Sequence, residues 1–250
     1  MAKSSVVADS MKINRVKSGT NAAFNVLFAL LAAMAILPVI FVFIISISSE
    51  ESIRLVGYSF APRGFSASAY AFLWNERATI FQALFISVSM TCLGTLLGLA
   101  LTTTMGYVLS RPVFKMKSFY TWVVFIPMIF NGGMVASYVV NANVLGLKNT
   151  IWALILPLAV SSFNIIICKT FFRSTIPDSI IESAKMDGAS QLRIFGQIVL
   201  PISKPVLATI GLFLVFGYWN DWFQSSLYIS DSKLVSLQAL LNNMMKSLDY

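Results

Sequence analysis

The chain contains no histidine, only two cysteines, and few charged residues for its 250 positions. Histidine is the commonest metal ligand and general base, so its absence argues against metal chemistry and proton transfer. Cys92 and Cys168 stand alone in or beside apolar runs without C-x-x-C spacing, which predicts small core residues. With no paired carboxylates or cysteine–base pair either, the sequence predicts a non-enzymatic protein with no cofactor or metal.

The low content of charged residues also indicates whether the protein is surrounded by water or by lipid. Only 11% of residues are charged and 57% are hydrophobic, with a mean hydropathy of +0.79. A soluble domain carries about 25% charged residues. Since so little polar material cannot cover a water-facing surface, we expect an all-α, polytopic transmembrane helical bundle at 22–250, preceded by a tail at 1–21.

Uncharged stretches long enough to cross a bilayer give the span count. A hydrocarbon core of about 30 Å needs about 20 apolar residues as helix. Five stretches qualify, namely 22–47, 78–110, 118–147, 149–168 and 205–220, the last extending past Asp221 to 229. The first is too long for a signal peptide and lacks a small-residue cleavage site, so we expect it to be retained.

The basic residues alternate between the polar segments. Twelve of the eighteen Lys and Arg residues fall in the tail, in 111–117 and in 169–204, whereas segment 48–79 is balanced by acids. The positive-inside rule therefore places the N-terminus and the loop 174–204 in the cytoplasm, and 48–79 and 230–250 outside. Topology and anionic headgroups account for the net charge of +8, so no nucleic-acid partner is expected.

Segment 230–250 does not have the pattern of a sixth span. Its apolar residues suit an amphipathic surface helix: Leu234, Leu237, Leu240, Leu241, Met244, Met245 and Leu248. Either the protein ends outside, or the sequence stops before a sixth span. We expect the second.

Two features within the spans concern packing. The second span carries small residues three or four apart, which predicts close helix packing rather than a pore lining: Ser87, Thr91, Gly94, Gly98, Thr102 and Gly106. Pro127 and Pro157 predict kinks near Asn131-Gly132-Gly133 and Ser161-Ser162, as hinges or as fixed bends.

The sequence of the loop 174–204 predicts two helices joined by a sharp turn. Thr175 with Asp178, or Ser179 with Glu182, would form a capping box, with Pro177 in the first turn. The first helix would run to about Met186 and end at Asp187-Gly188, with Asp187 capping the second helix. That second helix would present its apolar residues before Pro201, namely Leu192, Phe195, Ile198 and Val199.

The same loop resembles a known motif. Glu182-Ser183-Ala184-x-x-Asp187-Gly188-Ala189, followed by Phe195, Ile198, Leu200 and Pro201, resembles the EAA loop of ATP-binding-cassette (ABC) importer permeases. In sugar permeases the pattern reads E-A-A-x-x-D-G-A-x(5)-F-x-x-I-x-L-P, and Ser183 replaces its first alanine.

Other segments extend the resemblance over nearly the whole chain. Ser59-Phe60-Ala61-Pro62 through Phe65 and Tyr70 looks like the outer segment of sugar permeases. Phe130-Asn131-Gly132-Gly133, with Gly146-Leu147-x-Asn149-Thr150, is similar to the LplC/YtcP-like branch, and Trp219-Asn220-Asp221-Trp222 resembles the fifth-span motif of maltose-type permeases. Such permeases normally have six core spans, and the last is missing here.

The resemblance implies a non-catalytic subunit of a type I sugar or oligosaccharide importer in a bacterial cell membrane. The implied partners are a second permease as a hetero-dimer, an ABC ATPase dimer that holds ATP and Mg²⁺, and an external sugar-binding protein. The implied ATPase-coupling residues are Glu182, Ser183, Ala184, Asp187, Gly188 and Ala189, and the implied loop anchors are Phe195, Ile198 and Pro201.

A substrate path is also expected, through Asn131, Asn164, Trp219, Asn220 and Asp221. Asp221 is the sole acid in a span-like segment, and such residues usually face a cavity or an interface. Its flanking tryptophans also suit simple anchoring at a span end.

Two other transport functions compete with the sugar importer. An ABC permease for peptide or phosphate would carry the same coupling loop. An ion-coupled secondary transporter would need acids or histidines inside the membrane, and Asp221 alone meets that requirement.

Overall fold

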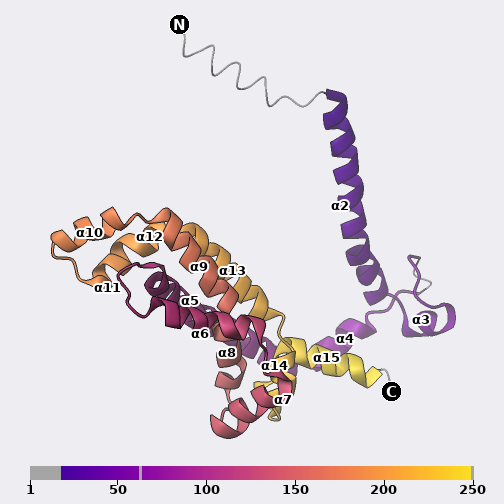
Figure 1. Ribbon diagram of the computed structural model, residues 1–250. Coiled ribbons are helices and arrows are strands. Elements are labelled where there is room, and N and C mark those ends of the chain that lie inside the picture. Colours follow the sequence, from indigo (N-terminus) through magenta and orange to yellow (C-terminus); the bar gives the residue numbers. More distant parts are fainter. Residues whose placement is uncertain (1–17, 62–63, 249–250) are drawn as a thin grey trace. The chain divides into compact units, whose positions relative to one another are not determined.

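The computed structural model describes residues 18–61 and 64–248, which are predominantly helical (Figure 1). An isolated antiparallel bridge between Ser48 and Phe65 is the β pairing found in this part of the chain. The all-α prediction is therefore confirmed. Most of the predicted tail, and Pro62 of the outer segment, lie outside the described residues. The chain divides into two compact units, 1–76 and 77–250, which are described separately.

The first unit contains one long apolar helix and two short ones. Helix α2 (Ser18–Ser46) has 29 residues, and at 1.5 Å per residue it is long enough to cross a membrane. Helices α3 (Glu50–Val56) and α4 (Ser68–Asn75) follow. The Ser49 hydroxyl caps α3 by accepting the Ser52 N–H at 3.4 Å, and the Tyr70 and Ser46 hydroxyls lie 2.8 Å apart.

The second unit is built around α5 (Arg77–Ser110), a helix of 34 residues. Helices α8 (Ile151–Ala159), α9 (Ser162–Thr175) and α13 (Lys204–Trp219) pack against it, and Figure 1 shows α9 and α13 running beside it. All six small residues of the predicted stripe are buried. A Cβ atom on Gly94 would overlap the Tyr218 ring, and one on Gly106 would lie 2.6 Å from the Cys168 Cβ. The packing interpretation of the stripe is confirmed.

The third and fifth predicted spans are not continuous helices. The third divides into α6 (Lys117–Ile129), α7 (Gly133–Tyr138) and the π-helix η1 (Val139–Val144). It breaks because the Asn131 Oδ1 atom accepts the Gly133 N–H at 2.9 Å and Gly133 adopts a φ of +81°. Similarly, α13 ends at Trp219, and α14 (Phe223–Tyr228) is a separate helix.

Bends reduce the number of simple spans further. Helices α8 and α9 meet at 48°, after Pro157, where the sequence predicts a kink. A second bend of 83° separates α13 from the segment Gln191–Ile202. Among the described residues, two single helices are long and apolar enough to cross a membrane, or up to four if each bent pair is one span. The predicted count of five spans is therefore approximate.

Short helices cover the two ends of the α5 bundle. At one end lie α10 (Asp178–Met186), α11 (Gln191–Ile194), η2 (Phe195–Val199) and α12 (Leu200–Ile202), while α14 and α15 (Leu237–Leu248) lie at the other (Figure 1). The Leu237 N–H donates to the Ser87 hydroxyl at 2.8 Å. Ala239 is buried, whereas Leu241 and Met245 are exposed, so α15 is a surface helix with one packed face, as predicted.

We expect Gly94→Ala to destabilise the bundle by about 1–3 kcal/mol, because the added methyl displaces the Tyr218 ring. That ring is fixed by its hydroxyl, which donates to the Ile155 carbonyl at 2.8 Å. Thermal unfolding in detergent measures the loss. Gly217→Ala is the matched control, since nothing lies within 4 Å of its new methyl. Equal stability of the two variants would contradict the packing argument.

Candidate coupling site

The candidate site is the helix that contains the EAA-like motif. Helix α10 (Asp178–Met186) follows Pro177, which is its N-cap and makes no side-chain capping bond. Both predicted capping boxes are therefore wrong. Proline fixes φ at the helix entrance without needing a side-chain acceptor, and the Ile180 N–H donates to the Pro177 carbonyl at 3.2 Å.

The C-terminus of α10 is a Schellman motif. The Ala189 N–H donates to the Ala184 carbonyl and the Gly188 N–H to the Lys185 carbonyl, both at 3.0 Å. Gly188 has a φ of +79°, the left-handed conformation that this motif requires. The turn prediction for Gly188 is confirmed.

Asp187 does not cap the second helix. It is the C-cap of α10, and the N-cap of α11 (Gln191–Ile194) is Ser190, whose hydroxyl accepts the Arg193 N–H at 3.3 Å. The turn occupies Gly188 and Ala189, so the second helix begins too late for the Asp187 carboxylate to cap it.

The six predicted coupling residues divide between two faces of α10 and its turn. Ala184 is buried together with Ile181, and Ala189 is half-buried. The other four are exposed, namely Glu182, Ser183, Asp187 and Gly188. Ala184 thus contributes to the core, and the exposed carboxylates and Ser183 are free for contact.

The second arm of the loop is fixed by a π-helix. After α11 come η2 (Phe195–Val199) and α12 (Leu200–Ile202). Ile194 and Val199 are fully buried, five residues apart, which matches the i→i+5 repeat of a π-helix. The predicted anchors Phe195 and Ile198 are half-buried against the same apolar cluster.

Two residues of this arm differ from the prediction. Leu192, expected on the apolar face, is 84% exposed, because the π geometry brings Ile194 inward instead. Pro201 is also exposed in α12. The anchoring interactions of the arm therefore come from Ile194, Phe195, Ile198 and Val199.

Arg111 fastens the start of α10 to the end of α5. Its guanidinium Nη2 donates to the Phe172 carbonyl at 2.9 Å, and Nη1 to the Ile176 carbonyl at 3.4 Å. Nη1 also forms an ion pair with the Asp178 carboxylate at 3.0 Å. The guanidinium lies 5.3 Å from the centre of the Tyr107 ring. One side chain therefore binds the end of α9, the start of α10 and the last turn of α5.

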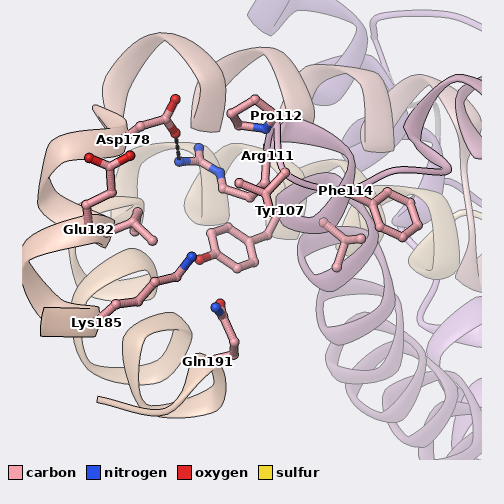
Figure 2. Close-up of a pocket in the computed structure, with 11 residues that line it drawn as sticks. Tyr107, Arg111, Pro112, Phe114, Asp178, Glu182, Lys185 and Gln191 are labelled. Carbon is pink, nitrogen blue, oxygen red and sulfur yellow. Dashed lines mark hydrogen bonds and ion pairs between the residues drawn. The ribbon is translucent and has the colours of Figure 1, made fainter. Parts of the chain in front are cut away.

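A cavity of about 300 Å³ separates α10 from this end of α5. Figure 2 shows Lys185 directed across it toward the Tyr107 ring, with Glu182 and Asp178 on the same helix. Apolar side chains complete the lining, including Val108, Phe114 and Ile181. The start of α10 is thus attached at Arg111, and Ile181 and Ala184 pack into the core, while Glu182 and Lys185 border the cavity.

Of the five predicted substrate-path residues, Asn131 lines a cavity. That cavity, of about 400 Å³, also contains polar and aromatic side chains that were not predicted: Ser137, Asn141, Phe223, Gln224 and Tyr228. The Asn141 Nδ2 atom donates to the Tyr228 hydroxyl at 3.1 Å, and the Tyr228 and Tyr138 rings stack 5.8 Å apart.

The other four path residues lie elsewhere. Asn164 is buried within α9. Trp219 ends α13, and the Asn220 side-chain amide donates to the Phe216 carbonyl at 3.0 Å. The Asp221 carboxylate accepts the Gln224 N–H at 3.1 Å and so stabilises the first turn of α14. These residues do not line the Asn131 cavity.

Sequence reasoning missed Arg111 and Ile194. In the sequence, Arg111 stands out only as one of the charges of the basic loop. The pattern that could have indicated a structural role is its position directly after the longest predicted span and before Pro112. No sequence pattern indicated that Ile194 is buried, because an α-helical repeat that starts at Leu192 does not place residue 194 on the apolar face.

Two relatives resemble this chain over most of its length. Protein LplC of Bacillus subtilis (strain 168) is 38% identical over 218 residues, which is 87% of this chain and 73% of that protein. The polygalacturonan/rhamnogalacturonan transport system permease protein YtcP of the same strain is 39% identical over 218 residues, covering 87% and 74%. The chain belongs to the LplC/YtcP-like branch of carbohydrate ABC transporter permeases. No family model matches the permease.

A solved structure shows the same fold. A bacterial ABC transporter involved in the import of the acidic polysaccharide alginate has a chain similar to this permease, with a TM-score of 0.81 and 28% identity. The match covers 94% of this chain and 84% of that one. The permease is thus a membrane transport subunit with the fold of an ABC importer permease.

We expect Arg111→Met to loosen α10 more than Asp178→Asn does. The Asp178 side chain is 54% exposed, so its ion pair contributes no more than about 1 kcal/mol. Losing the bonds to the Phe172 and Ile176 carbonyls costs about 1–3 kcal/mol in addition. Hydrogen exchange of amides 178–189 should therefore accelerate by about tenfold to a hundredfold in Arg111→Met, and severalfold at most in Asp178→Asn. Equal acceleration would show that the ion pair alone holds the helix.

Proposed function

We propose that this permease forms half of the translocation path of an ATP-driven importer of sugars or oligosaccharides, and receives the work of ATP hydrolysis through α10. The polygalacturonan/rhamnogalacturonan transport of YtcP and the alginate import of the solved transporter support a polysaccharide-derived substrate. The ATPase, with its ATP and Mg²⁺, is a separate subunit in this proposal. A second permease and an external sugar-binding protein complete the assembly.

The distribution of basic residues supports an orientation in which the α10 end of the bundle faces the cytoplasm. The segments beside α10 are rich in basic residues, with three in 111–117 and five in 169–204. The positive-inside rule places this end of the bundle, and the N-terminus, in the cytoplasm. The Asn131 cavity lies among α7, η1 and α14, and α14 belongs to the opposite end of the bundle (Figure 1). It is our candidate for part of the substrate path, together with the predicted residues Asn164, Trp219, Asn220 and Asp221.

The observation that carries the coupling proposal is that both ends of α10 are fixed. Arg111 binds its first turn, and the Schellman motif at Gly188 closes its last. A subunit that pushes on a helix moves the rest of the protein only if the helix does not yield at its ends. Helix α10 meets this requirement in nine residues.

The exposed surface of α10 and its turn suits a protein partner. Met186 is 88% exposed and Leu192 is 84% exposed, on either side of the Gly188 turn. Large apolar side chains grouped in this way mark interaction sites. The Glu182 and Asp187 residues are exposed as well, and their carboxylates can pair with basic groups of an ATPase groove.

A second candidate substrate class is a phosphorylated polyol. The sn-glycerol-3-phosphate transport system permease protein UgpE of Salmonella typhi is 32% identical over 133 residues, 52% of this chain and 47% of that protein. The coupling proposal is the same for both candidates.

We expect Gly188→Val to abolish transport and ATPase co-purification while membrane insertion is retained. A β-branched residue is strongly disfavoured at a φ of +79°, so the Schellman turn opens. Uptake assays and pull-down from solubilised membranes measure both effects. Gly188→Asn is the matched control, since asparagine tolerates this conformation and nothing lies within 4 Å of its Cβ position. Normal uptake by Gly188→Val would refute the coupling role of α10.

Substrate class is tested by reconstitution. We expect the ATPase activity of the assembled transporter in nanodiscs to rise severalfold with binding protein loaded with an oligosaccharide, and to stay basal with glycerol 3-phosphate. Stimulation by glycerol 3-phosphate alone would favour the second candidate. Maltodextrin, galacturonan and alginate fragments form the first screen.

A further inference from the structure

A basic groove lies beside the Arg111 anchor, at the end of the α5 bundle that contains α10. The loop between α5 and α6 and the first turns of α6 line an open hollow of about 450 Å³. Its lining combines two lysines, two hydroxyls and two aromatic rings: Lys115, Lys117, Ser118, Thr121, Phe114 and Trp122, with Pro112. Such a lining presents charged and hydroxyl donors to one bound group.

Two more cations border this groove. The Lys169 ammonium of α9 donates to the Thr121 hydroxyl at 3.1 Å, and Arg173 shares a smaller cavity of about 110 Å³ with Lys117. The acid of that smaller cavity, Asp178, is already paired with Arg111. Within the described residues, Lys115, Lys117, Lys169 and Arg173 form no ion pair, so the groove attracts an anion.

A second cavity, with an apolar lining, adjoins the groove at Phe114. It measures about 270 Å³ and is lined by Thr104, Met105, Val108, Leu109, Phe114 and Tyr120. Phe114 lines both cavities, and its ring lies 5.6 Å from that of Tyr120. The α5 residues among them belong to a helix long and apolar enough to cross the membrane. The surface therefore changes from cationic at the helix end to apolar toward the membrane interior.

We propose that these joined cavities bind an anionic phospholipid. The headgroup phosphate would lie against Lys115 and Lys117, with the Ser118 and Thr121 hydroxyls as further donors. An acyl chain would fill the apolar cavity beside Phe114. Basic recesses between membrane helices are known to take anionic headgroups, and Trp122 and Tyr120 are residue types that lie at the headgroup level.

A free phosphate ion would satisfy the cations equally well. It would leave the apolar cavity beside Thr104 and Val108 unfilled, and that cavity is part of the same surface. Charge and apolar lining together therefore favour a lipid as the source of the phosphate. The proposal depends on the protein lying in a membrane, and is independent of which solute is transported.

Native mass spectrometry of the full chain, released from nanodiscs of mixed phosphatidylglycerol and phosphatidylcholine, tests the proposal. We expect preferential retention of phosphatidylglycerol. Lys115→Gln with Lys117→Gln should lower that preference on the order of tenfold, since each basic residue near an anionic membrane surface contributes several-fold in affinity. The same two positions changed to arginine should retain it.

Lys185→Gln with Lys204→Gln is the matched control. It removes the same charge from exposed positions near this end of the bundle but outside the groove. Equal loss in control and test variants, or equal retention of both lipids by the unchanged protein, would overturn the proposal. Displacement of phosphatidylglycerol by excess inorganic phosphate or glycerol phosphate would do so too, because it would show that the groove binds the anion without the chain.

Discussion

Close approach of neighbouring helices to α5 is the constraint on which the second unit depends. Lipid offers no hydrophobic drive for helices to associate, so contact area and backbone proximity must supply the stability. The buried stripe from Ser87 to Gly106 provides this proximity, and Gly94 lets the Tyr218 ring rest on the α5 backbone. Tyr218 in turn bonds to the Ile155 carbonyl, so α5, α8 and α13 meet at one point.

Arg111 extends that core to the candidate coupling site. It stands one residue beyond α5, and its guanidinium donates to the Ile176 carbonyl and to the Phe172 carbonyl, which also accepts the Ile176 N–H at the end of α9. The ends of α9 and the start of α10 are thereby fixed to the most deeply packed helix of the unit. The proposed lipid groove begins at the adjacent residue, Pro112, and shares Lys117 with the small cavity beside Asp178. The candidate coupling helix α10 and the proposed lipid groove therefore both adjoin the short loop after α5.

Residue patterns predicted the features that depend on local chemistry. Small-residue spacing gave the buried face of α5, and glycine after Asp187 gave the turn at Gly188. Apolar length alone failed for the stretch 118–147, because a side-chain bond from Asn131 and the left-handed Gly133 end the helix inside an uncharged run. In the second arm the predicted Phe195, Ile198 and Val199 do face the core, but Leu192 is exposed and the buried Ile194 lies five residues before Val199, the spacing of a π-helix. Arg111 was missed since its partners are backbone carbonyls 61 and 65 residues away, which no sequence pattern reveals.

The bend of 83° between the Gln191–Ile202 segment and α13 has a mechanical consequence. The two axes are nearly perpendicular, so motion along one axis is sideways motion for the other. Ser203, at the corner, is fully buried, and α13 continues from it without a flexible linker. Lifting this arm toward the membrane would consequently tilt α13 rather than slide it lengthwise. A displacement of the arm along the bundle axis would in this way become a lateral displacement of α13, the helix that packs along α5.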